Sequence, residues 1–156
     1  MDISRGIYPP SLDLTQENVN LNKADFLDMS VSLENGDIMT KVFCKMDLFP
    51  FDVKSFPFLE SNLDDKICYK VFYGQIVRFQ RLCSFRCHFE ERACFLLKIL
   101  LERHYYSRFL KREYCKAVEK YVSEFQRWAI PVSIYQWFDE LASRINPDNQ
   151  SINQDV

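Results

Sequence analysis

The feature that most constrains the fold is an alternating stretch around Asn35-Gly36, which reads DFLDMSVSLENGDIMTKVFCK over residues 25–45. Asn-Gly is a strong hairpin signal because both central residues of a type I′ turn need a positive φ. A two-residue loop fixes the register, and the predicted cross-strand pairs are Leu33–Ile38, Val31–Thr40 and Met29–Val42. One face of this hairpin is then largely apolar, so we expect it to pack against something.

From about residue 69 the spacing of apolar residues changes to the 3.6-residue period of a helix. The pattern predicts helices over about 69–83, 86–103, 107–125 and 134–145, with Ser107 and Ser133 as N-caps of the last two. The predicted buried faces are Phe72, Ile76, Phe79 and Cys83 on the first helix; Phe89, Ala93, Leu96, Leu97 and Leu100 on the second; and Leu110, Tyr114, Ala117, Tyr121 and Phe125 on the third.

These signals indicate an α+β fold, in which an N-terminal β-hairpin precedes a bundle of three to four helices. A short break at His104-Tyr105-Tyr106 separates two of the helices, which fits a helix-turn-helix arrangement. The expected segments are an irregular stretch 1–23, the hairpin and a link rich in Pro and Phe over 24–67, the helix-turn-helix-like part 68–128, a C-terminal helix 129–147 and a disordered tail 148–156.

Composition excludes several classes of protein. The chain has only 3 glycines and lacks both the P-loop pattern and the dinucleotide-binding pattern. Its N-terminus has no apolar signal core, so its 6 cysteines do not indicate a secreted disulfide framework. No run of about 18 apolar residues predicts a membrane span. We therefore expect an intracellular protein with reduced thiols, either nuclear or cytoplasmic.

Charge is distributed unevenly along the chain. Residues 70–128 carry 13 Lys and Arg against 6 Asp and Glu, a net charge of +7. Residues 1–69 carry a net −6 and residues 129–156 a net −3. A basic centre between acidic flanks is compatible with nucleic acid, with an acidic protein surface or with contact between parts of the same chain.

Seven residues of the basic centre are candidates for contact with the nucleic-acid backbone. On the third predicted helix the cations recur at every fourth position, which suits the tracking of phosphates. An ordinary solvated helix face would carry the same pattern. The candidates are Arg108, Arg112, Lys116 and Lys120 on the third helix, and Gln75, Arg78 and Arg81 on the first.

Metal and catalytic sites receive little support from the sequence. Cys83, Cys87, His88 and Cys94 do not have the spacing of a zinc site, and Cys83 falls on a predicted core face. Two histidines provide no arrangement for nucleophilic catalysis.

Asp64-Asp65 is an acidic pair of the kind that binds catalytic magnesium, but SNLDDKIC lacks the strand–turn–strand setting that such a pair needs. We therefore expect no catalytic residue, no metal and no cofactor.

The order of several motifs resembles the C-terminal part of reverse transcriptases from Penelope-like and related animal retroelements. The matching stretches are FLD at Phe26–Asp28, Lys45 and Asp47 after the hairpin, and GQ-x2-R-x2-R-x-C-S at Gly74, Gln75, Arg78, Arg81, Cys83 and Ser84. In that family these motifs follow the catalytic palm, and the helical part is a helix-turn-helix domain. The resemblance covers about residues 25–125.

Two departures from that family matter. His104 stands where the family has a glycine at the helix break, although glycine takes a positive φ without strain. The catalytic aspartates of the family would precede Phe26, where only about 25 residues without a pattern stand. The resemblance thus implies a non-catalytic fragment that binds the nucleic-acid backbone. The alternatives are a protein–protein interaction module, docking through the hairpin, and a functionless remnant.

Overall fold

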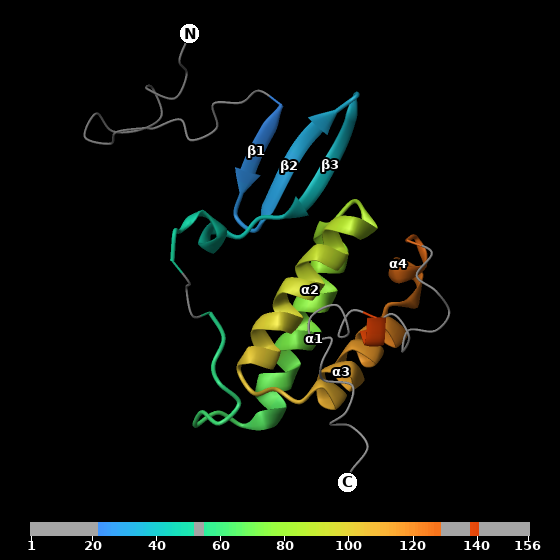
Figure 1. The fold of residues 1–156 in the computed structure, drawn as a ribbon. Coiled ribbons are helices and arrows are strands. Elements are labelled where there is room, and N and C mark those ends of the chain that lie inside the picture. Colours follow the sequence, from blue (N-terminus) through green and yellow to red (C-terminus); the bar gives the residue numbers. More distant parts are fainter. Residues whose placement is uncertain (1–21, 52–54, 129–137, 141–156) are drawn as a thin grey trace, which may run out of the picture.

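The computed structural model of the chain describes residues 22–51, 55–128 and 138–140, and it confirms the α+β class (Figure 1). A three-stranded antiparallel sheet stands at one end of a group of helices. The elements are β1 (Lys23–Phe26), β2 (Met29–Glu34), β3 (Asp37–Val42), the 3-10 helix η2 (Lys45–Leu48), α1 (Asp65–Leu82), α2 (Arg86–Glu102), α3 (Ser107–Lys120) and α4 (Val122–Gln126). None of the helices in the described ranges is both long and apolar enough to cross a bilayer.

The predicted hairpin forms with the predicted register. Leu33 pairs with Ile38, Val31 with Thr40 and Met29 with Val42. Asn35 and Gly36 both have positive φ, 52° and 89°, as a type I′ turn requires. The two-residue Asn-Gly turn is therefore enough to set the pairing of β2 with β3.

The sheet also contains β1, which the sequence did not predict. β1 pairs antiparallel with β2, and a tight turn at Leu27-Asp28 joins them. Leu27 has a φ of 53°, a conformation that a bulky residue seldom adopts. The turn contains neither glycine nor asparagine, so the sequence carries no signal for it. The predicted boundary of the irregular segment 1–23 is wrong by one residue, because β1 begins at Lys23. Asn22 is in a turn, and residues 1–21 lie outside the described residues.

Helix α1 begins four residues earlier than predicted, at Asp65. The Asp64 side chain caps it, since Oδ1 accepts a 2.7 Å hydrogen bond from the backbone N–H of Lys66. The first turn is exposed, and for this reason the apolar period starts only at Cys68-Tyr69. Asp64-Asp65, the acidic pair weighed above as a possible magnesium site, thus forms the N-terminus of a helix.

A Schellman motif ends α2 and produces the turn into α3. The N–H of His104 donates to the carbonyl of Leu101, and the N–H of Tyr105 donates to the carbonyl of Leu100, both at 3.1 Å. His104 takes a φ of 68° at the position where glycine is usual. The N-cap of α3 is Tyr106 and not Ser107 as predicted, and it makes no side-chain capping bond.

The third predicted helix is broken at Tyr121, whose φ and ψ are −122° and 40°. Beyond this break α4 changes direction, so that Phe125 and Trp128 contact Phe89 of α2 with ring centroids 5.7 and 4.9 Å apart. Burial of these two rings is the physical reason why the helix does not continue straight to residue 125.

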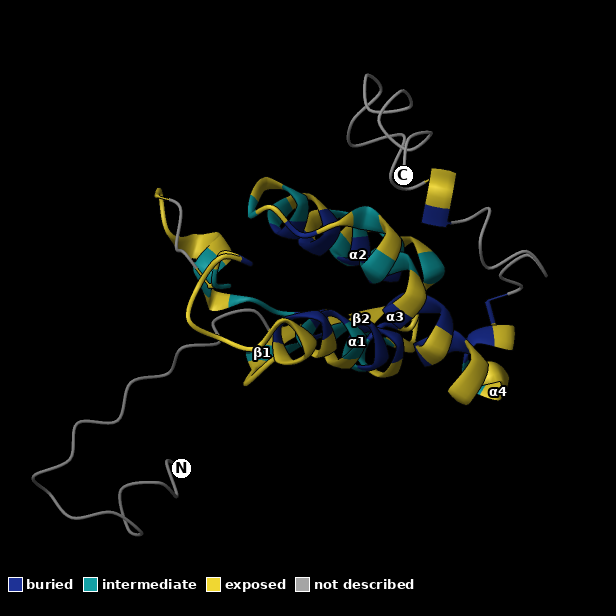
Figure 2. Ribbon diagram, turned by 90° about the horizontal axis from the view of Figure 1, so that it is seen from below, coloured by how far each residue is buried: buried dark blue, intermediate teal, exposed yellow. Residues whose placement is uncertain are grey.

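The core lies between the three long helices (Figure 2). Helices α1 and α3 run parallel, because Tyr69 contacts Phe109 near their N-termini and Arg81 contacts Tyr121 near their C-termini. The predicted buried residues of α1 and α2 are all buried, and of the α3 stripe only Tyr121 is partly exposed.

The fourth predicted helix and the predicted tail fall mostly outside the described residues. Residues 138–140 are helical, and Phe138 is buried against Phe72 and Tyr114, with ring centroids 6.5 and 5.8 Å apart.

Candidate nucleic-acid interface

The four predicted cations of α3 occupy one exposed arc of the helix. A spacing of four residues advances about 40° round the axis, so the four positions span about 120°. All four are exposed. The opposite side of α3 is buried through Leu110, Tyr114 and Ala117, which are fully enclosed by the core. The structure therefore brings these cations together on one face.

A buried carboxylate organises the middle of this arc. Glu113 is only 6% exposed, and its Oε1 lies 2.5 Å from Nζ of Lys116 and 3.6 Å from Nε of Arg112. The two cations share one negative charge, so positive charge remains at the surface. The ion pairs hold Lys116 and Arg112 in place while their side chains stay 52% and 58% exposed.

Arg81 of α1 joins the C-terminal end of the same face. Its guanidinium carbon lies 5.2 Å from the centroid of the Tyr121 ring, and Nζ of Lys120 lies 5.6 Å from that centroid. Both cations therefore sit on one ring. Nearby, a 2.7 Å hydrogen bond from the Ser123 hydroxyl lowers the pKa of Glu124, with a smaller contribution from Arg81. Glu124 thus moderates the positive charge at this end.

Three aromatic rings lie among these cations. We call the whole set the α3 surface. It consists of Arg81, Tyr106, Arg108, Phe109, Arg112, Lys116, Lys120 and Tyr121.

The other two candidates on α1 make a different contact. Nη2 of Arg78 lies 3.0 Å from Oδ2 of Asp28, and Nη1 donates a 3.2 Å hydrogen bond to Oε1 of Gln75. Asp28 belongs to the β1–β2 turn, so Arg78 and Gln75 connect the sheet to α1. The ion pair depends on the tertiary fold, which brings together residues 50 positions apart, and nothing in the local sequence indicates it.

The candidate metal residues do not converge. Cys83 is buried, which raises the pKa of its thiol, whereas Cys87 is exposed. Asp64 is used as the α1 cap. Within the residues that the structure describes, no three His, Cys, Asp or Glu side chains lie close enough together to hold a metal ion.

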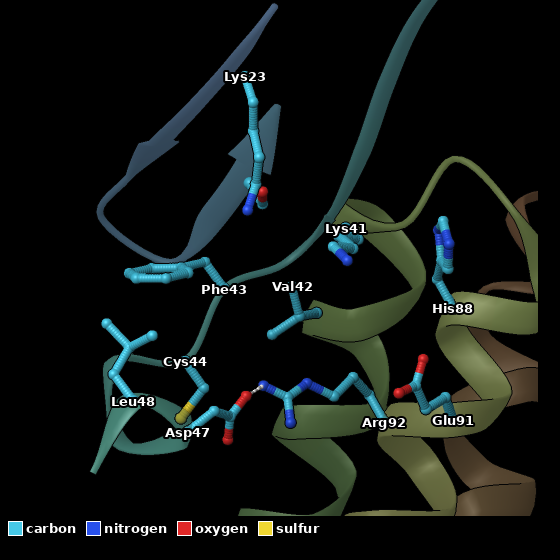
Figure 3. A pocket seen from close by; sticks show the side chains of 11 residues that line it. Lys23, Lys41, Val42, Phe43, Cys44, Asp47, Leu48, His88, Glu91 and Arg92 are labelled. Carbon is cyan, nitrogen blue, oxygen red and sulfur yellow. Dashed lines mark hydrogen bonds and ion pairs between the residues drawn. The ribbon is translucent and has the colours of Figure 1, made fainter. Parts of the chain in front are cut away.

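A hollow of about 230 Å³ lies between the sheet and the N-terminal part of α2 (Figure 3). Lys23 and Lys41 come from the sheet, and His88, Glu91 and Arg92 come from α2. Arg92 is ion-paired with Asp47 of η2. Asp47 and Glu91 offset two of the three cations, and Nζ of the remaining Lys23 lies 3.8 Å from Oδ2 of Asp25, so the hollow does not select an anion and we assign it no ligand.

The apolar face of the sheet is the second exposed feature. The cross-strand pair Leu33 and Ile38 is 49% and 72% exposed, and Phe26 of β1 on the same face is 67% exposed. The end of the sheet near Val42 contacts the helices, since Val42 is buried and Thr40 exchanges backbone and side-chain hydrogen bonds of 2.8–2.9 Å with Ser84. The expectation that this face must pack is thus met only at that end within the described residues.

Comparison of the chain with protein-family models, curated proteins and solved structures found no match.

Proposed function

We propose that the protein is a non-catalytic module that binds the backbone of nucleic acid through the α3 surface. The observation that carries the proposal is the separation of faces on α3. Its exposed arc holds Arg108, Arg112, Lys116 and Lys120, while its other side is buried in the core. Arg81 extends the same positive region onto α1. Lys and Arg side chains with exposed charged ends are the groups that contact phosphate oxygens.

The resemblance to the post-palm region of animal retroelement reverse transcriptases supports the same proposal. Arg81 belongs to the motif that carries the resemblance, and α2, the turn and α3 have the order of a helix-turn-helix. The polymerase activity of that family is not proposed for this chain, because its sequence provides no matching palm aspartates.

The experiment is a titration of labelled single-stranded and duplex oligonucleotides with purified protein at several salt concentrations. If about five cations each neutralise a phosphate, the logarithm of the affinity should fall with the logarithm of the salt concentration, with a slope of about 3.5 for a single strand and about 4.5 for a duplex. The variant Arg108→Glu/Lys120→Glu should abolish binding at moderate salt. It leaves the Glu113 ion pairs intact, because neither residue takes part in them.

Lys45→Glu/Lys98→Glu is the matched control. It makes the same change of net charge at two exposed lysines outside the α3 surface. Binding should be almost unchanged in this control. No binding at low salt, or an equal loss in both double variants, would refute the proposal.

The exposed sheet face supports a second candidate, docking of a partner protein through the hairpin. Exposed apolar patches of this kind mark interaction sites or cause self-association. In this case the wild-type protein should form oligomers in sedimentation experiments, and Ile38→Lys should suppress them without altering nucleic-acid binding. A monodisperse wild-type monomer that captures no partner counts against this candidate.

A further inference from the structure

The rings of the α3 surface lie among the cations at its two ends, Tyr106 and Phe109 at the N-terminal end and Tyr121 at the C-terminal end. The guanidinium carbon of Arg108 lies 4.7 Å from the Phe109 centroid and 5.9 Å from the Tyr106 centroid. The guanidinium carbon of Arg112 lies 5.1 Å from the Phe109 centroid. Tyr121, with Arg81 and Lys120, occupies the other end, about 22 Å away along the axis at 1.5 Å per residue.

Tyr106 differs from the other two rings because it is 60% exposed, whereas Phe109 and Tyr121 are partly buried. A large exposed ring does not contribute much to the core of the protein. Arginine–aromatic contacts occur on many surfaces, but a ring that stays largely open beside the cations is free to accept a ligand.

The structure holds Tyr106 in place without covering it. Its backbone N–H donates a 3.1 Å hydrogen bond to the hydroxyl of Tyr69, which belongs to the core of α1. Its ring meets the Phe109 ring edge-on, with centroids 6.2 Å apart at an interplanar angle of 80°. A ring that is already ordered loses little conformational entropy when a ligand packs on it.

Base faces are available for stacking in a single strand and hidden in a duplex. Single-strand binding proteins combine a positive track for the phosphates with aromatic side chains on which bases stack, and bases also stack on guanidinium planes. The α3 surface has both components.

We infer that the ligand of the α3 surface is a single-stranded nucleic acid, with one base stacked on Tyr106 and the phosphates following Arg108, Arg112, Lys116 and Lys120. This inference rests on the proposed function and names the class of ligand that it would bind.

Three probes of similar charge test it: an oligothymidylate of about 15 nucleotides, near the upper site size of small single-strand modules, a duplex of about half that length, whose two strands together carry a similar number of phosphates, and a single strand of the same length as the oligothymidylate but without bases. Wild-type protein should bind the oligothymidylate most tightly. Tyr106→Leu should weaken that binding by about 5- to 150-fold, the range that the stacking of one base supplies. Binding of the duplex and of the base-free strand should be the same in Tyr106→Leu as in the wild type.

Two further variants complete the design. Tyr106→Trp keeps a stacking ring and should retain tight binding, so the test holds even if Tyr106→Leu is poorly folded. Phe95→Leu is the matched control, because Phe95 is also exposed, at 49%, and also has an arginine over its ring, Arg92 at 5.5 Å, but it lies on α2. It should leave all three affinities unchanged.

The outcomes separate the two proposals. Salt-sensitive binding of all three probes with equal affinity, or a Tyr106→Leu effect that is equal on all three, overturns the single-strand inference and leaves the proposed function standing. The absence of salt-sensitive binding to any probe overturns both.

Discussion

His104 lies at the C′ position of the Schellman motif that ends α2, and its φ of 68° is the basis of a direct test. The perturbation is a pair of substitutions, His104→Gly and His104→Ala. Both remove the same side-chain contacts, a 3.2 Å approach of Nδ1 to Oε1 of Glu60 and an edge contact with Phe58 at 5.8 Å. They differ only in the backbone, because alanine keeps the strain of a Cβ at positive φ and glycine does not.

The expected difference in free energy of unfolding between the two variants follows from two opposing effects. The left-handed conformation costs a residue with a Cβ about 1–2 kcal/mol. Glycine loses about 0.5–1 kcal/mol more backbone entropy on folding than alanine. The midpoints of the two ranges differ by about 0.75 kcal/mol, so the glycine variant should be more stable than the alanine variant by about that amount. The His104 and Glu60 side chains are 61% and 78% exposed, so their loss should cost at most about 1 kcal/mol in either variant.

The assay is urea denaturation of both variants and the wild type, followed by far-ultraviolet circular dichroism. With a slope of about 2 kcal/mol per molar urea, the midpoints of the two variants should differ by about 0.3–0.5 M. Wild type should lie near the glycine variant or between the two. If His104→Ala were as stable as His104→Gly, the turn would not be held at positive φ in solution, and the Schellman geometry would be refuted.

Three further predictions concern other contacts. Asp64→Ala should lower the free energy of unfolding by about 1 kcal/mol because α1 loses its cap, whereas Asp64→Asn should lower it by much less; equal losses would contradict a capping role. A double-mutant cycle on Asp28→Ala and Arg78→Ala should give a coupling of about 0.2–1 kcal/mol, since both groups are partly exposed, and zero coupling would show that the sheet and α1 are not joined by this pair. Burial raises the pKa of Tyr114 above its ordinary 10.0 and that of Cys83 above 9.0. The unfolded chain therefore loses these protons first, so this contribution to stability is fully present below about pH 9 and is lost as the pH rises through the raised pKa values. The urea midpoint of the wild type should fall in alkali, and the midpoint of the Tyr114→Phe variant should fall less steeply. Identical pH profiles of the midpoint in the two proteins would contradict burial of the phenol.

Local patterns in the sequence determined much of the fold. The Asn35-Gly36 turn set the register of β2 and β3, because a type I′ turn leaves one pairing open to the two strands. The 3.6-residue period identified the buried faces of α1 and α2, because burial of an apolar stripe is what holds such helices together. The exposed arc of cations on α3 could be predicted for the same reason, since it lies opposite the apolar stripe.

The tertiary structure decided the features that depend on distant residues. β1 forms although its turn places Leu27 at a positive φ, because pairing with β2 outweighs the local preference. α3 ends at Lys120 and the chain turns at Tyr121, because Phe125 and Trp128 are buried against Phe89. Contacts with distant elements also separate the candidate residues of α1 into two groups. Arg81 and Arg78 are three residues apart on one helix, yet the packing of α3 on one side and of the β1–β2 turn on the other places Arg81 at Tyr121 and Arg78 at Asp28. Helical periodicity gives the direction of a side chain from its own helix, whereas the partner that it meets depends on which element the fold brings to that side.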